Sequence, residues 1–517
     1  MRALAGKRVL VTGFTGFLGQ AVVERFLLDF PDTRLVLLVR PQLGSTGRER
    51  VEQICSRPAF NALRERLGHE GLAALIDERI EVVEGDLSRE EPLELPGDLD
   101  VVMHCAATVS FDPPIDEGFR TNLLGAVRLY EAVVASGSRP HLVHVSTAYV
   151  AGNRRGVIPE ATLDHRVDWR AETELALQAR RDVEAASRKP EMLDRFLEKA
   201  RREHGRAGPQ TVAEDAEERR KAWVTKRLVH YGRARAQTLG WPDNYTFTKA
   251  MGERAAEELA AEHGLPLSIV RPSIIESALR HPYPGWIEGF KMADPIILAY
   301  GRGAIPEFPG IPEGIVDIIP ADFVVNAMLA VAATVPEPGR PAYYHVSTGA
   351  RNPLQFKDLY RLVRGYFQEH PLPVQGRGDV KVPEWTFPGA IKVERRLRQA
   401  ERFVEIADRV VSHLPKSTRM RDLVRRVDRD RGRVEFVRRY ADLYGVYTEA
   451  EVIYTDDRLA ELWNSLTKGD RERFPFDPTE VDWRHYLTEV HCPAVTAGVR
   501  ALSAARAEPK VRIRERE

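Results

Sequence analysis

The amino-acid sequence predicts an α/β protein with a doubly wound parallel sheet, a helical insertion and a mostly helical C-terminal domain. Short apolar runs alternate with helical stretches, a glycine-rich turn follows the first of these runs, and a charged Ala-rich stretch interrupts the alternation. Parallel strands are buried on both faces, so near-continuous apolar runs are typical of them. Alternation of such runs with helices favours a sheet with helices on both sides.

Six apolar runs are predicted to be the strands of this sheet. Helices are expected between them, for example over Phe17–Phe30 and Asn122–Ser136. The predicted strands are Arg8–Gly13, Arg34–Arg40, Arg79–Asp86, Asp100–Ala106, His141–Thr147 and Leu267–Ser273.

A charged stretch from about residue 172 to 237 is rich in Ala, Arg, Glu and Lys, which favours several helices. Breaks are predicted at Lys189-Pro190 and at Gly208-Pro209. We therefore expect a helical insertion over about residues 160–240. It is either an exposed decoration of the sheet domain or a cap over the active site.

A Pro- and Gly-rich passage from Pro371 to Gly389 predicts a linker. The expected domains are therefore residues 1–370, which form the sheet domain, and residues 371–517. The pattern after the linker is helical and Arg-rich to about Arg439, and the polar tail after Ala504 is expected to be disordered.

Bulk composition excludes several classes of protein. Lys plus Arg and Asp plus Glu are both 76 in 517 residues, a balance that gives no support to nucleic-acid binding. Three scattered cysteines, Cys55, Cys105 and Cys492, predict neither disulfides nor a metal site, and fit a reducing compartment. The sequence lacks an apolar run of about 18 residues and begins its first strand near Arg8, so we expect a cytoplasmic protein without a spanning helix or signal peptide. Peripheral membrane contact stays open.

A glycine motif follows the first predicted strand. The spacing GxxGxxG places glycines where the chain must turn tightly and approach a pyrophosphate closely, and the next helix offers its N-terminus to the phosphates. The strand, the helix and the units that follow agree with this reading, so the motif predicts Rossmann-type dinucleotide binding. The residues expected to contact the cofactor here are Gly13, Thr15, Gly16, Phe17, Leu18 and Gly19.

The end of the second strand predicts NADPH rather than NADH. A carboxylate that would bind the ribose hydroxyls is absent there, and Arg40 can pair with a 2′-phosphate, helped by Arg48 and Arg50. Further cofactor contacts are expected from Asp86 and Leu87 after the third strand and from the small residues after the fourth strand, Ala106, Ala107 and Thr108.

A serine and a threonine, Ser146 and Thr147, end the fifth predicted strand, and a YxxxK motif, Tyr245 to Lys249, lies far downstream. This spacing puts the tyrosine and the lysine one helical turn apart on the same face. A neighbouring ammonium favours the phenolate and lowers the pKa of the tyrosine, which makes it a usable proton donor. A hydroxyl from the strand would polarise the substrate carbonyl. Cys105 is expected to be a small buried residue rather than a nucleophile.

This assembly resembles the extended short-chain dehydrogenase/reductase superfamily. The resemblance assigns Thr147, Tyr245 and Lys249 to catalysis, with Thr147 as the hydroxyl residue. It assigns Asn122 to the structural asparagine and Pro272, followed by Ser273 and Ile274, to the backbone that meets the nicotinamide carboxamide.

Several ordered segments are similar to fatty acyl-CoA reductases, and in particular to the bacterial alcohol-forming type. The resemblance runs from about residue 5 to about residue 498. The segments that carry it are HCAAT at 104–108, NYTFTKA at 244–250, RPSIIES at 271–277, PGWIEG at 284–289, DIIPAD at 317–322, FDP at 476–478 and VDWRHYL at 481–487.

The resemblance implies NADPH-dependent reduction of a long-chain acyl-CoA, or acyl-carrier protein, to a fatty alcohol through an enzyme-bound aldehyde. Thr147 and Tyr245 would stabilise the oxyanion, and Tyr245 would supply the proton. Candidate residues for an apolar channel are Trp286, Ile287, Phe290, Ile296, Ile297 and Leu298.

Three alternatives remain from the sequence. An aldehyde-forming reductase of the same fold would stop after two electrons. A nucleotide-sugar dehydrogenase would share the Rossmann half but not the segment around Trp286 or the helical C-terminal domain. A non-catalytic NADP-binding regulator would usually lack the Tyr245 and Lys249 pair that this chain has.

Overall fold

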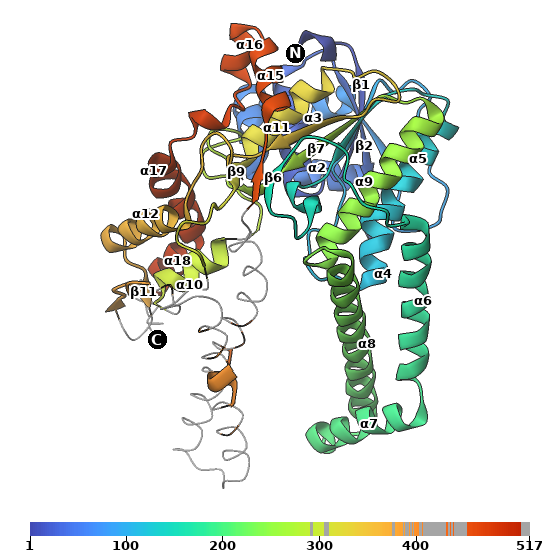
Figure 1. The fold of residues 1–517 in the computed structure, drawn as a ribbon, viewed down its shortest axis with the longest axis vertical. Helices are drawn as coiled ribbons and strands as arrows, with labels where there is room; N and C mark the ends of the chain where they lie inside the picture. The colour runs from blue at the N-terminus through green and yellow to red at the C-terminus, as the bar shows by residue number, and fades with distance from the viewer. Residues whose placement is uncertain are drawn as a thin grey trace, which may run out of the picture.

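The chain folds around a seven-stranded parallel sheet with helices on both faces (Figure 1). This computed structural model describes residues 1–289, 293–303, 310–374, 378–385 and 452–507, together with residue 387 and scattered residues between 392 and 438. The strand order is β3-β2-β1-β4-β5-β7-β10. Their bounds are β1 Arg8–Thr12, β2 Arg34–Val39, β3 Ile80–Glu84, β4 Val101–His104, β5 His141–Val145, β7 Leu267–Pro272 and β10 Ala342–Val346.

Alternate residues of the strands pack into two separate hydrophobic cores, one on each face of the sheet. Val9 and Val11 of β1 pack in one core with α1 and α11, whereas Leu10 packs in the other core with α5 and α9. A sheet that buries both faces in this way is doubly wound, so the predicted fold class is confirmed. The helices around the sheet are α1 Phe17–Asp29, α2 Gly47–Cys55, α3 Asn61–Arg79, α4 Ile115–Gly118, α5 Gly125–Ala135, α9 Asn244–His263 and α11 Ala321–Ala332.

All six predicted strands are present, and each ends one or two residues before its predicted C-terminal bound. Those last residues leave the sheet and enter the loops at its carboxyl edge, where ligands bind in open α/β sheets. The sequence analysis did not predict the edge strand β10. It also missed the short strands β6 Gly156–Ile158, β8 Ile274–Glu276, β9 Ile318–Pro320, β11 Pro373–Val374, β12 Gly378–Asp379 and β13 Val452–Tyr454.

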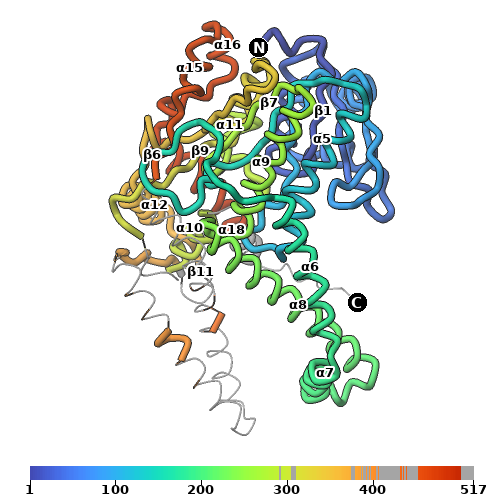
Figure 2. The backbone as a smooth tube through the Cα atoms, turned by 45° about the vertical axis from the view of Figure 1, so that its right-hand side comes forward, coloured from blue at the N-terminus to red at the C-terminus, as the bar shows by residue number. Residues whose placement is uncertain are grey.

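The charged stretch forms three helices that stand away from the sheet (Figures 1 and 2). They are α6 Trp169–Ser187, α7 Pro190–His204 and α8 Pro209–Leu239. Pro190 and Pro209 each occupy the first helical position, where the missing N–H of proline breaks no helical hydrogen bond. The helices α6 and α8 therefore lead from the sheet to a distal α7 and back.

The described C-terminal elements pack onto the sheet domain. Strand β13 pairs in parallel with β6, and α10 and α12 share a core with Cys492 and Val495 of α18. The predicted linker contains the β11–β12 pair, and the predicted Arg-rich helical run to Arg439 lies largely outside the described residues. The remaining helices are α10 Asp294–Gly301, α12 Phe356–Glu369, α15 Asp457–Ser465, α16 Lys468–Arg473, α17 Trp483–His485 and α18 Cys492–Ala507.

Two predictions about the chain ends and the membrane can be compared with the structure. Helix α18 continues to Ala507, three residues into the tail that was predicted to be disordered, and the rest of that tail lies outside the described residues. Within the described part of the chain, none of the helices combines the length and the apolar character needed to span a membrane. The domain boundaries, the cellular location and peripheral membrane contact stay predictions.

Candidate active site

The glycine loop joins β1 to α1 at the carboxyl edge of the sheet. Gly13 has a φ of +75°, and a Cβ atom on it would lie 2.7 Å from the backbone nitrogen of Ala106. A Cβ atom on Gly19 would lie 2.2 Å from the Gly13 carbonyl oxygen, so the turn and the helix pack without room for side chains. Gly16 is the N-cap of α1 and supplies no side-chain hydrogen bond to it.

The start of α1 therefore fits a phosphate group. Without a side-chain cap, the first N–H groups of the helix can bind an anion, and the helix dipole favours negative charge there. Thr15 lies in the turn, and Leu18 lies in the first turn of α1. The ring of Phe17 stacks on Trp286, with 4.7 Å between ring centroids. These residues surround the predicted pyrophosphate position, and their contacts with a cofactor remain predictions.

The predicted selector of NADPH, Arg40, is exposed and follows β2 directly. Arg48 instead forms ion pairs with Glu52 and Asp77, and Arg50 donates to the carbonyl oxygen of Arg40. Arg40 is therefore better placed than Arg48 for a 2′-phosphate.

Asp86 lies beside Arg40, after β3. Burial raises the pKa of Asp86, but hydrogen bonds from Ser88 and the charges of Arg40 and Arg89 outweigh this effect and leave it below its usual value. The carboxylate is therefore an available acceptor for the predicted adenine contact. The carbonyl oxygen of Leu87 accepts a hydrogen bond of 2.8 Å from Arg128.

The loop after β4 is held by its neighbours on both sides. The backbone N–H of Ala106 donates to the Thr12 hydroxyl at 3.2 Å, and that of Thr108 donates to the Asn122 side chain at 2.8 Å. Asn122 also donates to the Thr248 hydroxyl of α9 at 3.0 Å. Asn122 therefore ties the predicted cofactor loop, with Ala107 in its middle, to the helix that bears Tyr245 and Lys249. Its role as the structural asparagine of the site stays a prediction.

Thr147, Tyr245 and Lys249 come together at the carboxyl end of β5. Lys249 is buried, and its ammonium donates a hydrogen bond of 2.6 Å to the carbonyl oxygen of Val145, the last residue of β5. Tyr245 shares a side-chain hydrogen bond with Thr147. The Thr147 hydroxyl also donates to the carbonyl oxygen of Pro272 at 3.3 Å. A strand end and a helix start that are about 100 residues apart in sequence therefore form one group.

The protonation of this group follows from its burial. Burial raises the pKa of Tyr245, the carboxylate of Asp243 raises it further, and the hydrogen bond with Thr147 opposes both effects. Burial lowers the pKa of Lys249 to about 8, although Glu253 and Cys105 each raise it. At neutral pH the tyrosine is therefore a phenol that can donate a proton, and most of the lysine is an ammonium. The predicted lowering of the Tyr245 pKa by Lys249 is wrong for this structure, because burial dominates and leaves that pKa above its usual value.

Two buried histidines and a cysteine lie beneath Lys249. His104 and His144 are cross-strand neighbours on β4 and β5, and burial and the charge of Lys249 lower the pKa of both, that of His104 to about 3. Burial raises the pKa of Cys105 to about 12, although Lys249 opposes this. A thiol with that pKa is not a nucleophile near neutral pH, which agrees with the prediction that Cys105 is a packing residue.

The predicted nicotinamide side of the site is the segment after β7. Ser273 donates its backbone N–H to Val346 at 3.0 Å, and Ile274 donates its own to Asp317 at 3.1 Å. These bonds fix the chain beside Pro272, whose carbonyl oxygen accepts from Thr147. The segment and Thr147, the predicted catalytic threonine, are therefore in direct contact.

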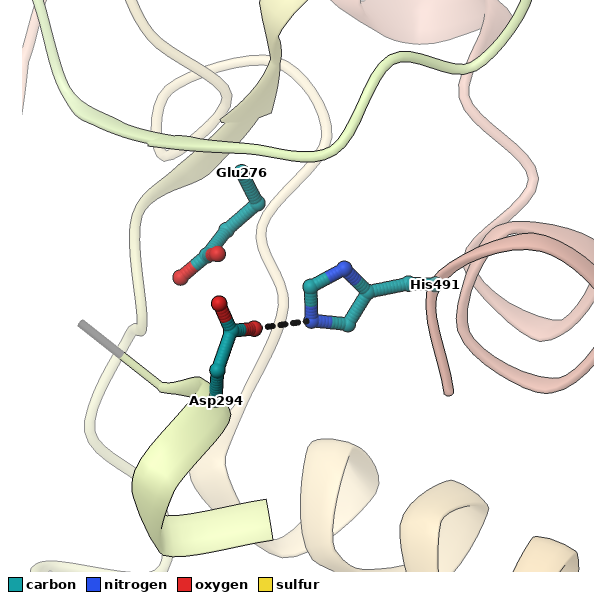
Figure 3. A group of neighbouring side chains, drawn as sticks. All are labelled: Glu276, Asp294 and His491. Carbon is teal, nitrogen blue, oxygen red and sulfur yellow. Dashed lines mark ion pairs between the residues drawn. The ribbon is translucent and has the colours of Figure 1, made fainter. Parts of the chain in front are cut away.

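A buried group of two carboxylates and an imidazole follows this segment (Figure 3). Glu276, Asp294 and His491 offer atoms that lie within 4.8 Å of one another, and His491 Nε2 is 3.4 Å from the Asp294 carboxylate. The other ring nitrogen of His491 is 3.0 Å from the Ser277 hydroxyl. The group joins β8, α10 and the segment before α18. The sequence predicts no metal site, and that absence stays a prediction.

The predicted channel residues are apolar and mostly enclosed. Trp286, Ile297 and Leu298 are buried, the first against α1 and the other two in the core shared by α10 and α12. Ile287 and Ile296 are partly buried, and Phe290 lies outside the described residues. Burial in a core and a place in a channel wall are compatible, so their role stays a prediction.

Sequence reasoning missed the residues that hold Tyr245 in place. Asp243 is the N-cap of α9, and its carboxylate accepts the backbone N–H of Thr246 at 2.8 Å. An Asp three residues before a Thr in a helix start is a recognisable capping signal that the sequence carried. Phe111, in the loop after β4, accepts the backbone N–H of Tyr245 at 3.1 Å and has no local sequence signal, because this contact joins distant segments.

Comparisons with known proteins agree with this geometry. The model of the NAD-binding domain described as male sterility protein matches residues 11–328, and a second model with the same description, the Sterile domain, matches residues 406–497. The chain is 30% identical over 519 residues to "Probable fatty acyl-CoA reductase 5" of Arabidopsis thaliana, which covers 96% of this chain and 98% of that protein. It is 29% identical to "Alcohol-forming fatty acyl-CoA reductase" of Simmondsia chinensis, over 96% and 98% of the two chains.

A solved structure supports the fold. The terminal R domain of the myxalamid biosynthetic pathway superposes with a TM-score of 0.53 at 16% identity, covering 98% of this chain and 92% of that domain. The sequence relatives named above are plant proteins, so the predicted assignment to the bacterial subgroup and to the extended superfamily stays a prediction. The matches over nearly the whole chain nevertheless show that this protein, an oxidoreductase with a nicotinamide-dinucleotide-binding domain, belongs to the fatty acyl-CoA reductase family.

Proposed function

We propose that this protein reduces a long-chain fatty acyl-CoA to the fatty alcohol with NADPH, as the bacterial alcohol-forming reductases do. The observation that carries this proposal is the convergence of Thr147, Tyr245 and Lys249 at the end of β5, beside the glycine loop. The names of the relatives support acyl-CoA as the substrate, and that of the Simmondsia protein supports an alcohol product.

The residues at the carboxyl edge fit NADPH in three respects. The start of α1 has open N–H groups for a pyrophosphate, the exposed Arg40 can pair with a 2′-phosphate, and Asp86 is an ionised acceptor for the adenine amine. When bound, NADPH supplies the hydride for carbonyl reduction.

The chain's own residues stabilise charge and move a proton. The hydroxyls of Thr147 and Tyr245 would donate hydrogen bonds to the carbonyl oxygen, where negative charge develops during reduction. Tyr245 would then transfer its phenolic proton to that oxygen. The ammonium of Lys249, one helical turn away, would stabilise the resulting phenolate, so that the proton can leave at neutral pH.

Conversion of a thioester to an alcohol takes two such reductions. The first releases the CoA thiol and leaves an aldehyde, and the second reduces that aldehyde with the same hydroxyl pair and another proton from Tyr245. Overall, one acyl-CoA, two NADPH and two protons give one alcohol, one CoA thiol and two NADP⁺. A closed apolar wall around Trp286 would keep the aldehyde bound between the two steps.

The test is the amount of NADPH oxidised per long-chain acyl-CoA consumed, with product identification in the same sample. The proposal predicts two NADPH per acyl-CoA and the alcohol as product. One NADPH per acyl-CoA with accumulated aldehyde would show the two-electron enzyme instead. Failure to oxidise NADPH with any acyl thioester would reject the substrate class.

A further inference from the structure

The loop between β4 and α4 runs beside the proposed proton donor. The backbone N–H of Tyr245 donates to the carbonyl oxygen of Phe111 at 3.1 Å, and the two rings meet edge-on with their centroids 6.1 Å apart. The Asn244 side chain donates to the carbonyl oxygen of Pro113 at 2.9 Å. The backbone and the ring of Tyr245 are therefore both placed by this loop.

The helical insertion is bonded to the same loop. Arg233 of α8 binds the carboxylate of Asp112 with two N–H groups, and its Nε is 3.2 Å from Asp112 Oδ1. Asp112 lies between Phe111 and Pro113, and its side chain is only 13% exposed. Two parallel bonds from a guanidinium to a sheltered carboxylate fix both distance and orientation, unlike most surface ion pairs.

Two further contacts join the insertion to this region. Arg180 of α6 donates to the buried carboxylate of Asp116 at 2.7 Å, and to Glu117 at 2.8 Å, both in α4. Gly232 of α8 touches the side chain of Asn244, because a Cβ atom at that glycine would lie 2.1 Å from Asn244 Nδ2. Helices α6 and α8 therefore contact the loop at Asp112, the helix α4 that follows the loop, and the first residue of α9.

We propose that the insertion α6–α8 braces the proton donor, with Arg233 and Asp112 as positioning residues that hold the 111–113 loop against Tyr245. The inference rests on the proposed role of Tyr245. The sequence predicted that the insertion is either an exposed decoration or a cap over the active site. The proposed brace is a third role, because the insertion acts on the site through the 111–113 loop. Since both reductions use the same phenol, a loosened loop would slow each of them.

The expected effect is on turnover rather than on cofactor binding. Neither Arg233 nor Asp112 lies at the glycine loop or at Arg40, so the affinity for NADPH should change little. A displacement of about 1 Å at a reacting group can reduce the rate about 100-fold. We expect Asp112→Asn and Arg233→Gln each to lower kcat between about 10- and 100-fold.

A second ion pair on the same helix gives a matched control. Arg235, two residues beyond Arg233, binds the carboxylate of Glu172 in α6 with two N–H groups, and the Glu172 side chain is 7% exposed. This pair lies within the insertion and does not touch the 111–113 loop. Arg235→Gln and Glu172→Gln should therefore leave kcat within about twofold of the parent, whatever they do to thermal stability.

Three readouts separate positioning from general loss of structure. First, the reversed pair Asp112→Arg with Arg233→Asp should recover part of the kcat lost in either single variant. Second, the loss should fall on kcat alone, with the dissociation constant for NADPH unchanged in the Asp112 and Arg233 variants, because the loop contacts Tyr245 and not the glycine loop. Third, Arg233→Lys keeps the charge and loses the two-point contact, so it should show the same kcat loss if the glutamine variant does not fold.

Equal kcat losses in the two pairs, or unchanged kcat in the Asp112 and Arg233 variants, would overturn the brace. Tyr245→Phe distinguishes this from failure of the proposed function. If Tyr245→Phe retains full turnover, the role of Tyr245 is wrong and the brace falls with it. If Tyr245→Phe loses turnover while the Asp112 and Arg233 variants match the control pair, only the brace is wrong.

Discussion

Two helices begin at the carboxyl edge of the sheet, and their N-termini are built differently. Helix α1 begins after Gly16, which supplies no side-chain cap, whereas α9 begins after Asp243, whose carboxylate accepts the N–H of Thr246. An uncapped N-terminus can bind an anion with its free N–H groups, and a capped one has already used at least one of them on the cap. The difference fits the proposed roles, in which α1 binds the cofactor phosphates and α9 places Tyr245.

The largest predicted effect comes from the start of α9, which bears Tyr245. Tyr245→Phe removes the proposed proton donor, so kcat with long-chain acyl-CoA should fall about 1,000-fold, within the range of general acid catalysis. Steady-state kinetics under saturating NADPH would measure it. Tyr343→Phe on β10 is the control and should keep its turnover. It removes a hydroxyl that donates a hydrogen bond of 2.7 Å to Glu257 of α9. Similar losses in both variants would contradict the assignment.

The next largest effect is expected from adding a side-chain cap to the N-terminus of α1. Gly16→Asp would give α1 a side-chain cap and a negative charge where the phosphates are expected. The φ of −95° at Gly16 suits any residue, and a Cβ atom there would lie 3.2 Å from the Gly13 carbonyl oxygen, so the turn must adjust slightly. The affinity for NADPH should fall about 10- to 100-fold. Isothermal titration would measure the affinity. Gly365→Asp on α12, where a Cβ atom meets nothing within 4 Å, should not change it.

A smaller change concerns the choice of cofactor. Arg40→Glu removes the expected partner of the 2′-phosphate and adds a carboxylate that can bind ribose hydroxyls. The ratio of kcat/KM for NADPH to that for NADH should fall about 10- to 100-fold, which corresponds to the loss of one charge-assisted interaction. Arg34→Glu, at the opposite end of β2, should leave the ratio unchanged. A preference for NADPH that survives in the Arg40 variant would assign the selection to another residue.

The smallest effect comes from the cap of α9. Asp243→Ala should reduce the free energy of unfolding by about 1 kcal/mol. Because the Asp243 carboxylate raises the pKa of Tyr245, its removal should lower that pKa, so an ultraviolet absorbance titration should show the Tyr245 phenolate at lower pH than in the parent. Asp168→Ala removes the N-cap of α6 and should cost similar stability without the shift in the titration. Identical titrations of the two variants would show that Asp243 acts on the fold alone.

The two helix starts also differ in how far the sequence predicted them. The start of α1 is coded locally, since glycine spacing directly after an apolar run identifies a phosphate turn. Thr147 and Tyr245 were found because strand ends meet at one edge in a parallel sheet and because YxxxK has a fixed helical spacing. The loop residue Asp112 and its partner Arg233 were not found, since no local pattern pairs residues 121 positions apart.

The same reasoning explains which elements of the fold were missed. Strand β10 has the sequence AYYHV, and its tyrosine and histidine side chains carry polar groups. Such residues do not form the apolar run that predicts a buried strand, yet Tyr344 and His345 are buried. Strands β6 and β13 are three residues long and pair across nearly 300 positions. Short non-local pairings of this kind depend on the assembled structure rather than on local preference.

The central claim is that cofactor binding and proton donation are separate functions of these two helix starts. It is tested most directly by measuring the dissociation constant for NADPH and kcat with a long-chain acyl-CoA on Tyr245→Phe and Gly16→Asp in parallel. The account predicts that Tyr245→Phe loses kcat and keeps NADPH affinity, whereas Gly16→Asp loses NADPH affinity and recovers most of its kcat at saturating NADPH. Equal loss of both quantities in both variants would contradict it.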